Sequence, residues 1–224
     1  RQDKVDLEVP GGAGWLCKVD YGRVRGVVAE KQRLIRSSPL LLQAVGQKAA
    51  GVSGSQDDRG AYRLLAGDLR DMDTVAGALS QEGLDATAPT LVLCECVLAY
   101  LEPAHGDAVI AWAQQNFTDV LVVCYDVVKT SQAFAKVMLA NFRKRGAPLL
   151  GAAEDLEAVR RRFRAFEASD IRNMKRVYEA LVAASPGELR RIAALEIFDD
   201  PDQFALIMSH YCLVLAGGGA CAAL

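Results

Sequence analysis

Apolar runs alternate along this chain with stretches in which apolar residues recur every three or four positions. The first pattern is typical of buried strands and the second of amphipathic helices. The predicted strands cover residues 15–20, 61–66, 89–96, 120–126 and 210–216. Helices are predicted over 24–35, 105–116, 131–145, 154–166, 174–184 and 201–209. One more helix is predicted to begin within 68–73 and to continue through 79, and another to begin at Ser185-Pro186. This alternation predicts an α/β fold with a doubly wound, mostly parallel sheet.

Acidic residues stand where several of these strands end. Asp20, Glu95 and Asp126 each finish an apolar run, and Asp68 lies just beyond another. Ligands of parallel sheets bind at the carboxyl ends of the strands, so these acids are candidate ligand contacts. Glu95 stands out because a buried-looking, unpaired carboxylate in an apolar run costs several kcal/mol. Asp20, Asp68 and Asp126 also have a simpler interpretation, since an isolated aspartate often caps a helix.

Composition limits the classes of partner. The 26 basic and 28 acidic residues nearly cancel, which gives no electrostatic case for a nucleic-acid or membrane partner. The basic run RRRFR at 160–164 is interpreted as a solvated helix face. An apolar content of 51% is enough to fill the core of a single domain over residues 1–224.

The six cysteines are scattered, and most lie in apolar runs typical of core positions. Cys94 and Cys96 would share the strand face opposite Glu95, which is a poor arrangement for a metal site. No metal is therefore expected. Scattered free thiols favour a reducing compartment and hence a cytoplasmic location. The glycine-rich end, residues 217–224, is expected to fray.

Six segments resemble, in order, motifs of the leucine carboxyl methyltransferases, which use S-adenosylmethionine to methylate the terminal carboxylate of protein phosphatase 2A. They are KVDY (18–21), AGDLRD (66–71), PTLVLCECVLAYLEP (89–103), FAKVMLANFRKRGAPLLG (134–151), RRIAALEIFDD (190–200) and SHYCLVLA (209–216). The resemblance implies the class I methyltransferase fold with extra carboxyl-terminal helices. It further implies a cofactor-binding half at 15–130 and a helical insertion with the last strands at 131–216.

The same resemblance implies a role for individual residues. Asp20 would accept hydrogen bonds from the cofactor's ribose hydroxyls, and Asp68 from the exocyclic amine of its adenine, with Leu69 packed on the ring. Glu95 would face the ammonium group of the methionine portion. Tyr100 would lie near the substrate, the carboxyl-terminal tail of the phosphatase catalytic subunit. No general base is expected, because a terminal carboxylate is already an anionic nucleophile at neutral pH.

The chain departs from the family pattern near its start. The family's glycine-rich turn is represented only by PGGAG at 10–14, and the interval from Gly14 to Asp20 is too short for a crossover helix. The chain is therefore expected to be amino-terminally incomplete, either as a fragment of an active enzyme or as a degenerate paralogue. Two further interpretations remain. One is a non-catalytic, partner-binding module, and the other is a relative of the tRNA wybutosine-synthesis methyltransferase, through LEP (101–103) and IAWA (110–113).

Overall fold

The computed structural model describes residues 16–20, 25–45, 62–129, 132–197 and 199–223. The glycine-rich segments at 10–14 and 51–60 lie outside these ranges. The chain divides into two compact units, residues 1–85 and residues 86–224. That residues 1–224 form a single domain stays a prediction.

The first unit contains a parallel strand pair and three helices. Strands β1 (Leu16–Asp20) and β2 (Tyr62–Ala66) are in parallel register, with Asp20 opposite Ala66. The helices are α1 (Arg25–Ser37), α2 (Pro39–Val45) and α3 (Met72–Gln81). Both strands, α1 and α3 follow the predicted pattern, whereas α2 was not predicted. The order of strand, helix and parallel strand agrees with a crossover connection.

The second unit is built on a four-stranded sheet in the order β3-β4-β6-β5. Its strands are β3 (Thr90–Glu95), β4 (Val120–Val127), β5 (Ala168–Asn173) and β6 (Tyr211–Gly218). β3 and β4 are parallel, while β6 runs antiparallel to both β4 and β5. The sheet is thus mixed. β5 was not predicted, because this edge strand has only one buried residue, Ile171, and so shows no apolar run.

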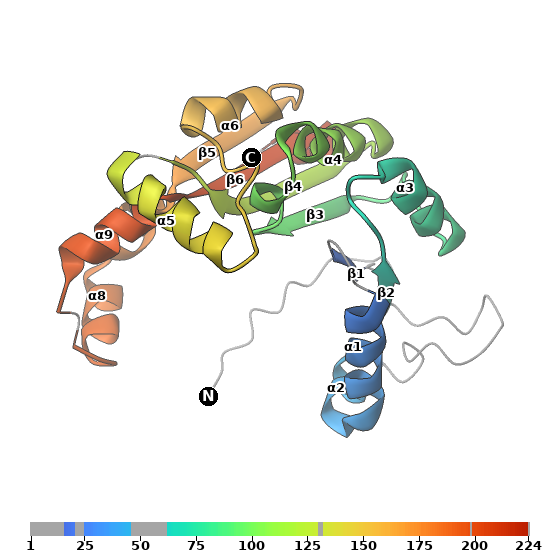
Figure 1. The fold of residues 1–224 in the computed structure, drawn as a ribbon, viewed down its shortest axis with the longest axis horizontal. Coiled ribbons are helices and arrows are strands. Elements are labelled where there is room, and N and C mark those ends of the chain that lie inside the picture. Colours follow the sequence, from blue (N-terminus) through green and yellow to red (C-terminus); the bar gives the residue numbers. More distant parts are fainter. Residues whose placement is uncertain (1–15, 21–24, 46–61, 130–131, 198, 224) are drawn as a thin grey trace. The chain divides into compact units, whose positions relative to one another are not determined.

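The second unit also contains helices and short turns. They are α4 (Pro103–Asn116), α5 (Gln132–Lys144), α6 (Leu156–Phe163), α7 (Met174–Tyr178), α8 (Pro186–Ala193) and α9 (Pro201–Ser209), with short turns η3 (Leu98–Tyr100), η4 (Glu179–Ala183) and η5 (Gly219–Ala222). α4 and α6 lie on the same side of the sheet (Figure 1). No helix in the described ranges is both long and apolar enough to cross a bilayer.

The two faces of the sheet differ in burial. Val120, Val122 and Cys124 of β4 point to one face and are at most 2% exposed. On β3 the side chains of Leu91 and Leu93 point to the other face and are 53% and 58% exposed. The period of two residues in a strand therefore separates a sealed face from an open one.

The carboxyl-terminal end of the chain is structured through residue 223, so the expectation of fraying was wrong. Strand β6 continues to Gly218, and η5 follows it directly. The N–H of Ala220 donates to the Asp119 carboxylate at 2.7 Å, and the N–H of Gly219 donates to Glu167 at 3.1 Å. Glycine is required at 217, since a Cβ there would lie 2.0 Å from the carbonyl oxygen of Cys221.

Candidate functional site

Two of the predicted cofactor contacts lie at one edge of the β1–β2 pair. Asp20 is the last residue of β1 and is opposite Ala66, the last residue of β2. Asp68 follows Ala66 by two positions, so the parallel register brings both acids to the same carboxyl-terminal edge. The backbone placement of Asp20 is described, whereas its side chain is not.

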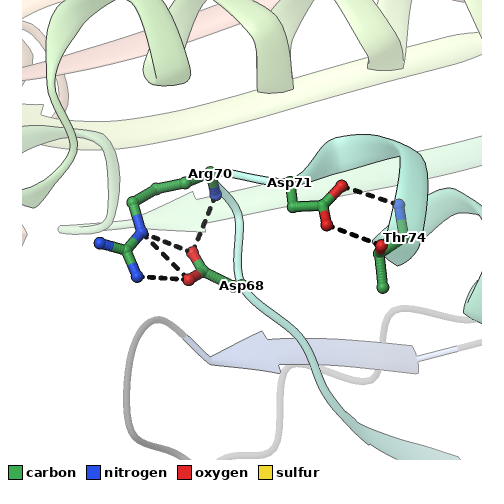
Figure 2. Close-up of polar contacts among 4 residues, drawn as sticks. All are labelled: Asp68, Arg70, Asp71 and Thr74. Atoms are coloured by element: carbon green, nitrogen blue, oxygen red, sulfur yellow. Dashed lines mark hydrogen bonds and ion pairs between the residues drawn. The ribbon is translucent and has the colours of Figure 1, made fainter.

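Asp68 is held by its neighbour Arg70 (Figure 2). The Arg70 backbone N–H donates to Oδ1 of Asp68 at 3.0 Å, and the guanidinium Nε donates to the same oxygen at 2.9 Å. The Asp68 carboxylate is 39% exposed, so the N–H group of a ligand that approaches from the solvent side can also donate to it. Leu69, which follows it, is only 7% exposed. The adenine roles of Asp68 and Leu69 stay predictions.

Helix α3 is capped by Asp71, so Asp68 is not its cap. The Asp71 carboxylate accepts the backbone N–H of Thr74 at 3.1 Å and its hydroxyl at 2.7 Å (Figure 2). The hydroxyl bond and then the backbone bond lower the pKa of Asp71. The helix-cap interpretation of Asp68 is thereby removed, because the cap position is already filled.

Glu95 ends β3 and is exposed, which corrects the interpretation of a buried carboxylate. The reason is alternation: Glu95 shares the open sheet face with Leu91 and Leu93 rather than the sealed one. Within the described ranges the Glu95 side chain has no hydrogen-bond or ion-pair partner. It can therefore receive a cationic group of a ligand without first breaking an internal contact.

Cys96, directly after Glu95, has a left-handed backbone with φ of 49°. Its N–H donates to the carbonyl of Tyr125 at 2.7 Å, which closes the ladder between β3 and β4. The strand thus ends at Glu95, and the expectation that Cys96 continues it on the face of Cys94 was wrong. Left-handed non-glycine residues cluster at functional sites, in agreement with a ligand role for this strand end.

Asp126 is a buried acid whose role the sequence left undecided. Only 7% of it is exposed, and its Oδ2 accepts the backbone N–H of Ala99 at 2.9 Å while Oδ1 accepts that of Val127 at 2.8 Å. Burial raises its pKa, and these backbone bonds partly oppose the rise. Asp126 therefore fixes the η3 turn rather than capping α5. An acid inside the apolar run VLVVCYDVV was the available signal.

The η3 turn is also fixed from the loop between α5 and α6. The N–H of Gly151 donates to the carbonyl of Ala99 at 2.9 Å. Leu98 and Ala99 are each 1% exposed. Tyr100 is the last residue of the turn, so its position is set by a rigid backbone. The Tyr100 ring packs edge-on against Phe142, with centroids 6.4 Å apart.

Two further tyrosines stand at the same end of the β3–β4 pair. Tyr125 is opposite Glu95 in the register, and its ring stacks on that of Tyr211 at 5.2 Å and an interplanar angle of 2°. Burial raises the pKa of the Tyr100 and Tyr211 phenols. Neutral phenols beside a free carboxylate can hydrogen-bond an anionic substrate. Tyr211 is half-buried in this stacked pair.

Burial, and after it the electrostatic effect of Tyr211, raises the pKa of Tyr125 to about 12. Tyr125 is therefore expected to stay protonated until about pH 12. The folded pKa lies above the ordinary value of 10.0, so the free energy of unfolding should fall as pH rises from 10 to 12. Ultraviolet difference titration of Tyr125→Phe should lack the step near pH 12. An unchanged titration curve would contradict the assignment.

No group of three His, Cys, Asp or Glu side chains is placed to hold a metal ion in the part of the chain that the structure describes. The cysteines of the sealed face are poor ligands, because burial raises the pKa of Cys94 to about 11 and that of Cys212 to about 12.

Comparison with known sequences finds one matching protein family and several similar proteins. The family described as leucine carboxyl methyltransferase matches residues 24–114. The chain is 37% identical over 208 residues to the rat tRNA wybutosine-synthesizing protein 4, covering 90% of this chain and 30% of that protein. It is 40% identical over 162 residues to the human protein of that name, covering 70% and 23% respectively. It is 30% identical over 215 residues to the Arabidopsis thaliana leucine carboxyl methyltransferase 1 homolog, covering 94% and 63%.

Solved structures agree on the fold. A putative methyltransferase from Thermobifida fusca superposes with a TM-score of 0.58 at 16% identity, covering 92% of this chain and 64% of that one. The plantazolicin methyltransferase, solved with S-adenosylhomocysteine, gives a TM-score of 0.51 at 6% identity and coverage of 91% and 68%. The architecture is therefore that of the methyltransferases. The chain spans under two thirds of the length of each of these three sequence relatives. In its sequence, the chain is thus similar to the leucine carboxyl methyltransferase family, whose model matches residues 24–114.

Proposed function

We propose that this chain carries out S-adenosylmethionine-dependent methylation of a carboxylate. The observation that supports this most is the end of β3, where Glu95 is exposed and has no partner in the described ranges. It lies in the segment PTLVLCECVLAYL, which resembles the family motif, and at the carboxyl end of a parallel strand, where ligands of such sheets bind.

Several residues of this chain suit the proposed cofactor. The free Glu95 carboxylate suits an ammonium group, since charge-assisted hydrogen bonds are strong. Asp20 is proposed to accept from ribose hydroxyls, and Asp68 from the exocyclic amine of adenine beside the Leu69 side chain. When bound, the cofactor would supply an electrophilic methyl group on a sulfonium.

The substrate is proposed to be the carboxyl-terminal leucine of the protein phosphatase 2A catalytic subunit. Its carboxylate is already an anion, so the protein needs to orient and desolvate it rather than deprotonate it. Tyr100 is proposed to contact this group, because the buried η3 turn holds it rigidly at the end of β3. The cytoplasmic location and the expectation of no nucleic-acid or membrane partner stay predictions.

A second candidate is carboxyl methylation in wybutosine synthesis on tRNA. The identities of 37% and 40% to two wybutosine-synthesizing proteins support it, against 30% to the Arabidopsis leucine carboxyl methyltransferase homolog. Both candidates share the donor and the acceptor group and differ in the molecule that carries the carboxylate.

Transfer of a labelled methyl group distinguishes the two substrates. We expect label in the phosphatase catalytic subunit, and none in a subunit without its terminal leucine. Label in tRNA from cells that lack the wybutosine methyltransferase, with an unlabelled phosphatase, would favour the second candidate. No label in either would leave a binding module, provided that the phosphatase still co-elutes with the chain.

Substitution of Glu95 by alanine should weaken S-adenosylhomocysteine binding by about 10- to 100-fold, the range expected for a lost charge-assisted hydrogen bond. Isothermal titration calorimetry of the wild type and the variant measures this. Glu102→Ala is the matched control, because Glu102 is exposed, lies seven residues after Glu95 in the motif at 89–103, and makes no side-chain cap bond. Equal affinity of wild type and Glu95→Ala would refute the assignment of Glu95.

A further inference from the structure

A groove of about 610 Å³ lies between α4 and α6 in the second unit. It is lined by residues of α4, among them Ala111 and Gln114, by residues of α6, and by the loop around Gly151. Figure 1 shows the two helices next to each other on one side of the sheet. No residue of the groove belongs to the site proposed above.

The groove has an excess of positive charge. Arg162 is paired with Asp107 at 2.6 Å, and Lys129 is paired with Glu154. Arg161 and Arg164 also line the groove, are exposed, and have no hydrogen-bond or ion-pair partner in the described ranges. Two arginine charges are therefore available to a ligand. Arginine suits carboxylates particularly well, since its planar guanidinium can bind both oxygens at once.

The spacing of these two arginines matches an extended peptide. Arg164 is the C-cap of α6 with helical dihedral angles, so Arg161 and Arg164 are three residues apart on one helical face. Their Cβ atoms are thus about 5–6 Å apart. Side chains two positions apart on an extended chain are about 6.6 Å apart and on the same side. Two acidic residues at alternate positions can therefore meet both arginines.

The groove has room for a short peptide and leads toward the η3 turn. It follows α4 from Pro103 to Gln115, which at 1.5 Å per residue is about 18 Å. That length accommodates about five extended residues. At the floor, Gly151 is hydrogen-bonded to Ala99 of the turn that ends in Tyr100.

We propose that this groove binds an acidic polypeptide segment with carboxylates at alternate positions, upstream of the carboxylate that is methylated. The statement that this polypeptide is the substrate rests on the proposed function, whereas the binding of an acidic peptide in the groove does not. An apolar side chain of the segment would pack on Leu150, which lines the groove and is 51% exposed.

Fluorescence anisotropy with a labelled Glu-x-Glu peptide of about eight residues tests the groove without any cofactor. We expect saturable binding that weakens with salt. Arg161→Ala and Arg164→Ala should each weaken it about three- to fivefold, as expected for exposed ion pairs, and the double variant about tenfold or more. Arg160→Ala is the control, because Arg160 is in the same helix, is paired with Glu157 and does not line the groove.

Each outcome is decisive for the groove. Equal binding by wild type and the double variant, with unchanged circular dichroism, would overturn the proposal, as would equal binding of a Gln-x-Gln peptide. Stronger binding of single-stranded RNA, lost in the same variants, would assign the groove to nucleic acid instead. Peptide binding without methyl transfer would contradict the proposed function and leave the groove proposal in place. Methylation that the double variant does not change would contradict the groove proposal and leave the proposed function in place.

Discussion

Replacement of Asp126 by alanine is expected to lower the free energy of unfolding by about 3 kcal/mol, because it leaves two buried backbone N–H groups without an acceptor. These are the N–H of Ala99, 2.9 Å from Oδ2, and the N–H of Val127, 2.8 Å from Oδ1. Urea denaturation followed by circular dichroism measures the change. Because Ala99 lies in η3, the variant should also lose order around Tyr100 before global unfolding, which hydrogen exchange of the turn reports.

Two companion variants sharpen this test. Asp126→Asn keeps one acceptor oxygen, so its free energy of unfolding should fall by about half as much as that of Asp126→Ala. Asp170→Ala removes an acid of the same charge that forms a surface pair with Arg172, so a change within about 0.5 kcal/mol is expected. A loss in Asp126→Ala no larger than in Asp170→Ala would show that the carboxylate does not hold the turn.

The pH dependence has a defined sign. Burial raises the pKa of Asp126 above its ordinary value of 3.8, so the folded state binds the proton more tightly than the unfolded state does. The contribution of this group to the free energy of unfolding should therefore fall as pH rises from 3.8 through the folded pKa. The alanine variant should lack this component of the pH profile.

Gly151→Ala is the second substitution with a large expected effect, again about 3 kcal/mol of destabilisation. A Cβ at this position would lie 2.4 Å from the carbonyl oxygen of Leu101 and 2.5 Å from that of Leu98. Both oxygens belong to a backbone with buried side chains, so they can move only if the η3 turn moves. Thermal or urea denaturation gives the loss directly.

The control for this substitution is Gly187→Ala. No atom lies within 4 Å of the Cβ position at Gly187, which is in the first turn of α8, so the variant should be neutral or slightly stabilised. If Gly151→Ala melted like Gly187→Ala, the close packing of the loop against η3 would be contradicted.

Helices and strands could be predicted from the sequence where the hydrophobic periodicity was strong. They could not be predicted where tertiary contacts determine the secondary structure. β4 and β6 are apolar runs buried on one face, so their residues alone indicate strands. β5 is an edge strand with charged residues at Asp170 and Arg172, and only its pairing with β6 makes it a strand. The order of strands also depends on pairing between segments about 90 residues apart, which local patterns do not report.

At the candidate site, residue positions could be predicted, whereas their surroundings could not. Glu95 was expected at a strand end and is found there, but the sequence did not show that its sheet face is open. Asp126 looked equally suited to a ligand or a cap, and only the fold shows that it accepts the N–H of a residue 27 positions earlier. Family resemblance indicated the roles of Asp20, Asp68 and Leu69, which no contact in the described ranges tests.

The position of β6 has a consequence for how the second unit folds. β6 is the last strand in the sequence, yet it lies between β4 and β5 in the sheet, and β5 pairs with no other strand in the described ranges. During synthesis, β5 has no partner until residues 211–218 have left the ribosome. The β4–β6 pairing then requires closure of a loop of more than 80 residues, a non-local step of the kind that slows folding. Completion of this sheet is therefore a late event, and the nascent chain presents the unpaired edge of β4 until then.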